Sequence, residues 1–185
     1  MPVVILSSSP NTDGLTAACV SSVANGLGDS GVSSREVRLT DSNIGLCRQC
    51  DNGWGTCREK HACQVEDGFQ VVHRTVLEAD ALVLVTPVYF GDLSESMKAF
   101  TDRLRRCEAT KQPKEPLGGK WLLCVAAAGG SGGGLVSCMQ QLERLAAHIG
   151  LARFDLIGIT RRTRDHQLTA IRESARALAK SLGSS

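Results

Sequence analysis

The sequence alternates short, continuously apolar runs with longer segments whose apolar residues recur every three to four positions. The short runs predict buried strands and the longer segments predict amphipathic helices. The five expected strands are 3–6, 35–39, 81–85, 121–126 and 154–159. Several of them are apolar on both faces, which requires a parallel sheet that helices cover on both sides. The chain is therefore expected to form an α/β fold with three layers and a five-stranded parallel sheet.

Five helices are expected to alternate with these strands. The third helix is expected to begin directly after Asp92, because Glu95 follows three residues later as in a capping box. The 185 residues, 42% of them hydrophobic, suit one domain with its own core, over residues 1–185. A cysteine-rich loop is expected as an insertion at about 45–67.

Charge and hydropathy limit the classes of partner. Lys and Arg total 21 against 19 Asp and Glu, so binding to nucleic acid or membranes through bulk positive charge is not expected. No run approaches the roughly 20 apolar residues of a membrane helix, and the first residues lack a signal-peptide pattern. We therefore expect a cytoplasmic protein whose partner is a small molecule or another protein.

Three unusual segments follow expected strands, where ligands of open parallel sheets bind. Residues 7–16 combine hydroxyls with the start of a helix, which favours a phosphate, although an ordinary capping turn has the same composition. Residues 86–93 contain an aromatic pair that suits a planar ring or, alternatively, a hydrophobic plug. Residues 129–134 include five glycines, so a ligand can approach the backbone closely, but a flexible loop has the same composition.

Two motifs carry a resemblance to a known family. The first is Ser8-Ser9-Pro10-Asn11 with Gly14, Leu15 and Thr16, and the second is Pro87-Val88-Tyr89-Phe90-Gly91, preceded by Ala79-Asp80 and followed by Lys98-Ala99-Phe100-Thr101-Asp102-Arg103. Over nearly the whole chain these segments resemble the flavodoxin-like NAD(P)H-dependent FMN reductases, in particular the iron-sulfur flavoprotein branch. The resemblance implies a single flavodoxin-like, FMN-binding domain.

The resemblance also implies which residues contact the flavin. Ser9, Asn11 and Thr16 would bind the FMN phosphate, and residues 87–91 would contact its isoalloxazine ring and ribityl chain. The full set of expected contacts is Ser7, Ser9, Asn11, Asp13, Leu15, Thr16, Pro87, Val88, Tyr89, Phe90, Gly91, Ala128, Gly129, Gly130 and Gly133.

The implied function is an FMN-dependent oxidoreductase. NADH or NADPH would reduce the flavin, which passes electrons to a quinone, a free flavin or another small-molecule or protein acceptor. No catalytic acid or base is expected, since the flavin carries the chemistry, and a homodimer or homotetramer is expected. One alternative is an electron carrier between protein partners, and another is a zinc-stabilised binding module that has lost the cofactor.

The eight cysteines fall into two groups. Four are scattered and are expected to pack as small hydrophobic residues. The other four, Cys47, Cys50, Cys57 and Cys63, lie within 17 residues and could surround an iron-sulfur cluster or a zinc ion. The resemblance favours a 4Fe-4S cluster, but the wide gap between Cys50 and Cys57 leaves zinc and a metal-free loop open.

Overall fold

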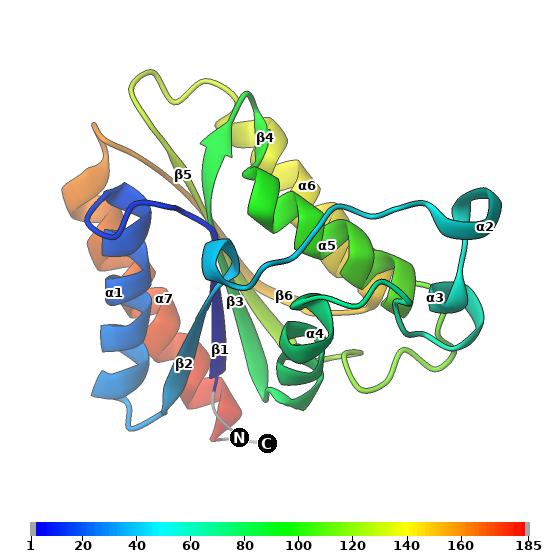
Figure 1. Ribbon diagram of the computed structural model, residues 1–185. Coiled ribbons are helices and arrows are strands. Elements are labelled where there is room, and N and C mark those ends of the chain that lie inside the picture. The colour runs from blue at the N-terminus through cyan, green and yellow to red at the C-terminus, as the bar shows by residue number, and fades with distance from the viewer. Residues whose placement is uncertain (1–2, 184–185) are drawn as a thin grey trace.

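The computed structural model describes residues 3–183 and contains the expected parallel sheet (Figure 1). Its parallel strands are β1 (Val3–Ser7), β2 (Ser34–Arg38), β3 (Ala81–Tyr89), β5 (Trp121–Ala128) and β6 (Ala152–Thr160). They lie in the order β2-β1-β3-β5-β6. When only parallel strands are counted this is 2-1-3-4-5, the flavodoxin-like order, so the predicted fold class is confirmed.

Helices cover both faces of the sheet. One face carries α1 (Leu15–Asp29) and α7 (Arg164–Leu182), and the other carries α4 (Phe69–Glu78), α5 (Glu95–Glu108) and α6 (Leu135–Ile149).

Each face has its own core, because successive residues of a strand point to opposite sides. In β1, Val3 and Ile5 pack in the core with α1 and α7, whereas Val4 and Leu6 pack toward α4, α5 and α6. A strand of this kind is apolar throughout, as its sequence predicted. On the first face α7 contributes three fully buried side chains, Ile171, Ala175 and Leu178.

The start of the third predicted helix was wrong. Asp92 belongs to a short strand, β4 (Asp92–Leu93), which pairs antiparallel with the end of β3, and α5 begins at Glu95 after Ser94. The reason is a tight turn in which Phe90 and Gly91 have φ values of 52° and 83°. Positive φ at both central residues reverses the chain into a hairpin, so Asp92 cannot cap a helix.

Residues 45–67, called here the cysteine segment, lie outside the sheet next to α5, on the right of Figure 1. A 3-10 turn, η1 (Leu39–Asp41), precedes the segment, which contains two single-turn elements, α2 (Cys50–Gly53) and α3 (Thr56–Glu59). Within α2, Asp51 and Asn52 have left-handed backbone angles, so this part is an irregular loop. None of the helices in residues 3–183 is both long and apolar enough to cross a membrane.

Candidate functional site

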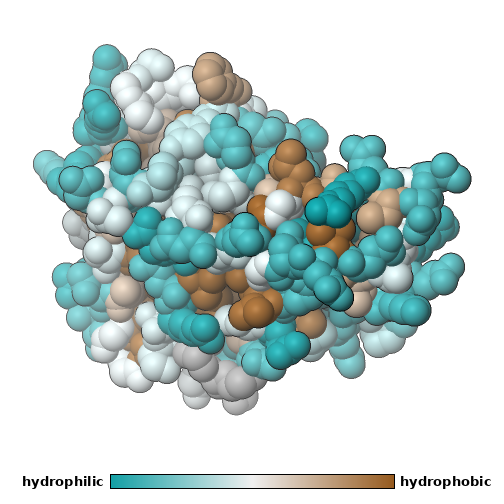
Figure 2. Space-filling view, in the orientation of Figure 1, coloured by the Kyte–Doolittle hydropathy of each residue, from teal (hydrophilic) through white to brown (hydrophobic). Residues whose placement is uncertain are grey.

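The carboxyl ends of the parallel strands meet at one edge of the sheet, at the top of Figure 1. Three loops lie there and together form what we call the loop edge: residues 8–14 after β1, residues 89–93 at the β3–β4 hairpin, and residues 129–134 after β5. Figure 2 shows pale, near-neutral atoms over this upper part of the molecule, in keeping with its serine and glycine content. The strand order reverses between β1 and β3, which is where sheets of this topology bind ligands.

The first loop is fixed to the neighbouring strand and helix through Ser8, which is buried. The Ser8 amide donates to the carbonyl of Val85 (3.2 Å), and Ser94 Oγ donates to Ser8 Oγ (2.8 Å). The hydroxyl of Ser96 donates to the Ser8 carbonyl (3.2 Å). These bonds join the first loop to β3 and to the start of α5, so Ser8 anchors the loop.

Beyond this anchor the first loop presents hydrogen-bond donors at the start of α1. The amide of Asn11 donates to Ser9 Oγ (3.2 Å), which forms a local turn. The helix begins at Leu15 and has no acidic residue in its first turn. Helix N-termini carry free N–H groups and a partial positive charge, which together favour anions.

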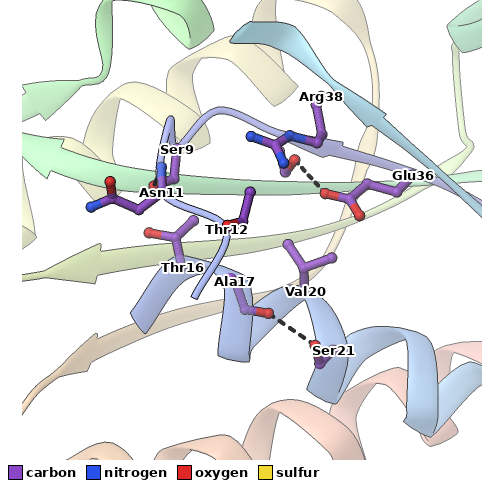
Figure 3. A pocket seen from close by; sticks show the side chains of 10 residues that line it. Ser9, Asn11, Thr12, Thr16, Ala17, Val20, Ser21, Glu36 and Arg38 are labelled. Carbon is purple, nitrogen blue, oxygen red and sulfur yellow. Dashed lines mark hydrogen bonds between the residues drawn. The ribbon is translucent and has the colours of Figure 1, made fainter. Parts of the chain in front are cut away.

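A polar pocket of about 120 Å³ opens between this loop, α1 and β2 (Figure 3). Its lining residues are Ser7, Ser9, Asn11, Thr12, Thr16, Ala17, Val20, Ser21, Glu36 and Arg38. Ser7 Oγ donates to Glu36 Oε1 (2.6 Å), and Arg38 Nη2 donates to the Pro10 carbonyl (3.4 Å). The two β2 side chains thus close one side of the pocket.

The pocket contains part of the predicted set and adds residues to it. Four of the predicted first-loop residues line it, namely Ser7, Ser9, Asn11 and Thr16, whereas Asp13 and Leu15 do not. Thr12, Glu36 and Arg38 were missed by the sequence reasoning. The signal that could have found the last two is the polar composition of β2, which identifies it as an edge strand beside the first loop.

The second and third loops meet each other. Gly91 lies so close to Gly134 that a Cβ built on Gly134 would collide with the Gly91 Cα and lie 2.8 Å from its nitrogen. Ser137 Oγ donates to the Gly91 carbonyl (2.7 Å) and fixes the hairpin to the start of α6. Phe90, at the tip, is fully exposed. Neither loop lines the pocket of the first loop.

Most of the second predicted loop is strand. Pro87, Val88 and Tyr89 belong to β3, and Pro87 still pairs with Ala127 of β5. In the third loop, Ala128 ends β5 and the amide of Gly132 donates to the Gly129 carbonyl (3.2 Å).

All four clustered cysteines line one cavity, which also borders Arg103 and Arg106 of α5. The cavity is narrow, about 20 Å³, enough for about one water molecule. Among residues 3–183, no three cysteine, histidine or acidic side chains are arranged to hold a metal ion. The thiols therefore surround a space instead of converging on one point.

Asp67 fastens the end of the cysteine segment. It accepts hydrogen bonds from Arg103 (2.6 Å) and from the amides of Gly45 (3.0 Å) and Phe69 (2.9 Å). Burial raises the pKa of Asp67, but these donors outweigh burial and leave the pKa below its ordinary value. Asp67 is consequently a carboxylate at neutral pH.

The scattered cysteines behave differently from the clustered ones. Burial raises the pKa of Cys19, Cys107 and Cys138 to about 12, and it also raises the pKa of Cys124. All four side chains are buried and free. They remain neutral thiols at physiological pH, as expected for small core residues.

A buried hydrogen bond joins α4 to α5. His73 Nε2–H donates to Glu108 Oε1 (2.7 Å), and Lys111 Nζ lies 2.7 Å from Glu108 Oε2. Burial raises the pKa of Glu108, but His73 and Lys111 outweigh burial and leave it below its ordinary value. The ring of His73 also packs against Phe69, 5.1 Å between centroids. This histidine is structural.

Residues 1–154 match the protein family described as NADPH-dependent FMN reductase. The chain belongs to this FMN reductase family. Its curated relatives include an iron-sulfur flavoprotein of Methanocaldococcus jannaschii, 29% identical over 143 residues, which are 77% of this chain and 70% of that protein. An iron-sulfur flavoprotein of Archaeoglobus fulgidus is 31% identical over 104 residues, which are 56% of this chain and 46% of that protein. The matched part of the chain thus covers less than half the length of the second relative.

Solved structures agree with the fold of the FMN reductase family. A crystal structure of RosB with bound 8-demethyl-8-formylriboflavin-5′-phosphate has a TM-score of 0.78 at 16% identity, covering 100% of this chain and 81% of that one. The NAD(P)H:quinone oxidoreductase from Methanothermobacter marburgensis has a TM-score of 0.74 at 17% identity, covering 96% of both chains. At these identities the likeness concerns the flavodoxin-like fold alone.

Proposed function

We propose that this chain is an FMN-dependent oxidoreductase that takes electrons from NADH or NADPH and passes them to a quinone, a flavin or another acceptor. The observation that carries the proposal is the loop edge. It combines a hydroxyl-rich loop at a helix N-terminus with a rigid hairpin and a glycine-rich loop. Membership of the FMN reductase family supports the same conclusion.

The side chains of the first loop suit a phosphomonoester. Ser9, Asn11 and Thr16 line the polar pocket, and the amides of residues 13–15 lie at the start of α1. Hydroxyls, amides and a helix N-terminus bind a phosphate without a metal ion. Arg38, whose guanidinium points toward the first loop in Figure 3, adds a positive charge that favours a phosphate.

The second and third loops suit the planar ring of the flavin. We assign residues 87–91 to ring and ribityl contacts, and we assign Ala128, Gly129, Gly130 and Gly133 to close backbone approach. Bound FMN would supply hydride and electron transfer chemistry, so the residues of the chain need only bind and orient the ring. The choice of electron acceptor and the preference for NADH or NADPH depend on the shape of the loop edge.

We further propose that Cys47, Cys50, Cys57 and Cys63 hold a 4Fe-4S cluster. Four cysteines that line one cavity supply the four thiolates that a 4Fe-4S cluster requires. The curated relatives named iron-sulfur flavoproteins support this choice. Because the cavity is narrow, the irregular loop around α2 has to widen when a cluster binds.

The same cysteines support a second candidate function, an electron carrier between protein partners. We also propose that the protein forms a homodimer or homotetramer, which sedimentation would test.

Eight free cysteines suit a reducing compartment, so we propose that the protein is located in the cytoplasm.

The decisive experiment is an anaerobic absorption spectrum of the purified protein with FMN, iron and zinc quantified in the same sample. We expect one FMN and about four irons per chain, and bleaching of the flavin by NADH or NADPH. Flavin that only dithionite bleaches would favour the electron carrier. Protein that cannot be reconstituted with FMN would contradict both functions.

Thr16→Val tests the assignment of the phosphate site. It removes one hydroxyl with little change of shape, and hydrogen bonds to charged groups are worth about 1.5–3 kcal/mol, so FMN should bind at least about tenfold more weakly. The matched control is Thr75→Val on the exposed side of α4, which should leave the affinity unchanged. Equal affinities in both variants would contradict the assignment.

A further inference from the structure

Among residues 3–183, Arg103 is the largest side chain that is fully buried, at 1% exposure. It lies on α5 and borders the same cavity as the four clustered cysteines. Its guanidinium packs over the ring of Phe69, 4.3 Å from the ring centroid, which fixes the plane of the group. A guanidinium is charged at every physiological pH, so a permanent cation borders the cysteine cavity.

The hydrogen bonds of this guanidinium can be counted. Nη1 donates to Asp67 Oδ2 (2.6 Å) and to the Gly45 carbonyl (3.1 Å). Nη2 donates to Cys63 Sγ (3.3 Å) and to the Val65 carbonyl (3.0 Å). An arginine has five N–H donors, so these contacts use four and leave Nε–H.

The fifth donor is buried and has no acceptor within residues 3–183. A buried N–H without a partner is costly. Another nitrogen of the same guanidinium, Nη2, already donates to a sulfur that lines the cavity, Cys63 Sγ.

We propose that Arg103 positions Cys63 as a ligand and, through N–H to sulfur hydrogen bonds, raises the reduction potential of the cluster bound in this cavity. The inference rests on the proposed cluster. Reduction adds one electron, supplied by the reduced nicotinamide through FMN, and no bond forms or breaks. The added negative charge is stabilised by a cation and by hydrogen bonds to sulfur, two factors that set the potentials of such clusters.

Arg106 provides the matched control. It also borders the cavity and carries a positive charge, but it donates to the Gly53 carbonyl and packs over Trp54. Lysine in place of either arginine keeps the charge. Only Arg103→Lys removes the planar set of donors that reaches Cys63.

The test is an anaerobic redox titration of the holoprotein, monitored by electron paramagnetic resonance, with iron and FMN measured per chain. We expect Arg103→Lys to lower the midpoint potential of the cluster and Arg106→Lys to leave it at the wild-type value. Arg103→Lys with full iron content and an unchanged potential would overturn the inference while leaving the proposed cluster intact. Wild-type protein that holds FMN but no iron would overturn the cluster and the inference together.

Asp67→Asn separates this role from simple anchoring of the segment. It weakens the ion pair but leaves the Nη2 contact to Cys63, and it removes a negative charge, so the potential should rise. Loss of iron from Arg103→Lys alone, with FMN retained, would support the positioning of Cys63. Shifts of both variants in the same direction, or equal loss of iron from both, would reduce Arg103 to an anchor and overturn the proposal.

Discussion

The loop edge and the cysteine segment are held in place by different kinds of interaction. The loop edge follows strands whose ladders fix its ends, and main-chain bonds such as Ser8 to Val85 fasten it further. The cysteine segment contains no strand and is fastened largely by side chains, above all by Asp67 and Arg103. A site built on a sheet edge tolerates the loss of single side chains better than a segment that a few side chains fasten.

The largest expected effect separates the two regions. Asp67→Ala leaves the buried charge of Arg103 unpaired, which costs about 3–5 kcal/mol of the free energy of unfolding. FMN affinity should not change, because the loop edge does not depend on this pair. Urea unfolding and FMN fluorescence titration measure the two quantities.

The control for this prediction is Glu173→Ala. Its carboxylate pairs with Arg176 on the surface of α7 and should contribute less than about 1 kcal/mol. A fall in FMN affinity in Asp67→Ala would mean that the two regions are coupled, and the comparison would then fail.

A smaller effect is expected for Glu108→Gln, which keeps the shape and removes the charge. Hydrogen bonds to charged groups contribute about 1.5–3 kcal/mol, so the variant should be less stable by about that amount at pH 7. The folded pKa of Glu108 lies below its ordinary value of 4.5. The Glu108 carboxylate therefore stabilises the folded protein fully above about pH 5. This stabilisation is lost as the pH falls below 4.5 and through the folded pKa of Glu108.

Unfolding curves of wild type and Glu108→Gln between pH 7 and pH 3 check this dependence. The difference between them should shrink toward low pH. A difference that stays constant would show that packing, and not charge, holds α4 to α5 here.

Gly134→Ala is the reverse of the Asp67 test, because it should damage the loop edge alone. Gly134 has a φ of 78°, and a Cβ there would displace the hairpin at Gly91. We expect FMN to bind about tenfold more weakly, with iron content unchanged. Gly28→Ala on α1, where a Cβ meets nothing within 4 Å, should leave both unchanged.

The smallest effect is expected for Phe90→Ala. The side chain is fully exposed, so stability should change by less than about 0.5 kcal/mol. Loss of an aromatic contact of about 0.5 kcal/mol should weaken FMN binding about twofold. Val71→Ala, another exposed apolar position, is the control, and equal FMN affinities would remove Phe90 from the flavin contacts.

The sequence predicted the elements whose signal is local. The continuous apolar run of β3 and the regular spacing in α6 are visible in a few neighbouring residues, and both are present. The turn between β3 and β4 was not predictable in this way. Its direction depends on positive φ values at Phe90 and Gly91, and an aromatic residue rarely adopts such a conformation.

In the candidate site, too, only the residues with a local signal could be predicted. Ser9 and Thr16 are adjacent to the turn that they serve, so their hydroxyls were recognised. Arg38 reaches the first loop across 28 residues and Arg103 reaches Gly45 across 58. Contacts at such separations follow from strand order and helix placement, which no single segment encodes.

The position of α7 has a consequence for synthesis. Ile171, Ala175 and Leu178 complete the core that begins with Val3 and Ile5, although they lie beyond the residues that match the family. Because a ribosome delivers the N-terminus first, β1 and α1 emerge long before the helix that covers them. Until residues 164–182 have been synthesised, α1 alone covers this face of the nascent sheet, so its apolar strand residues are exposed to water for most of the synthesis of this domain.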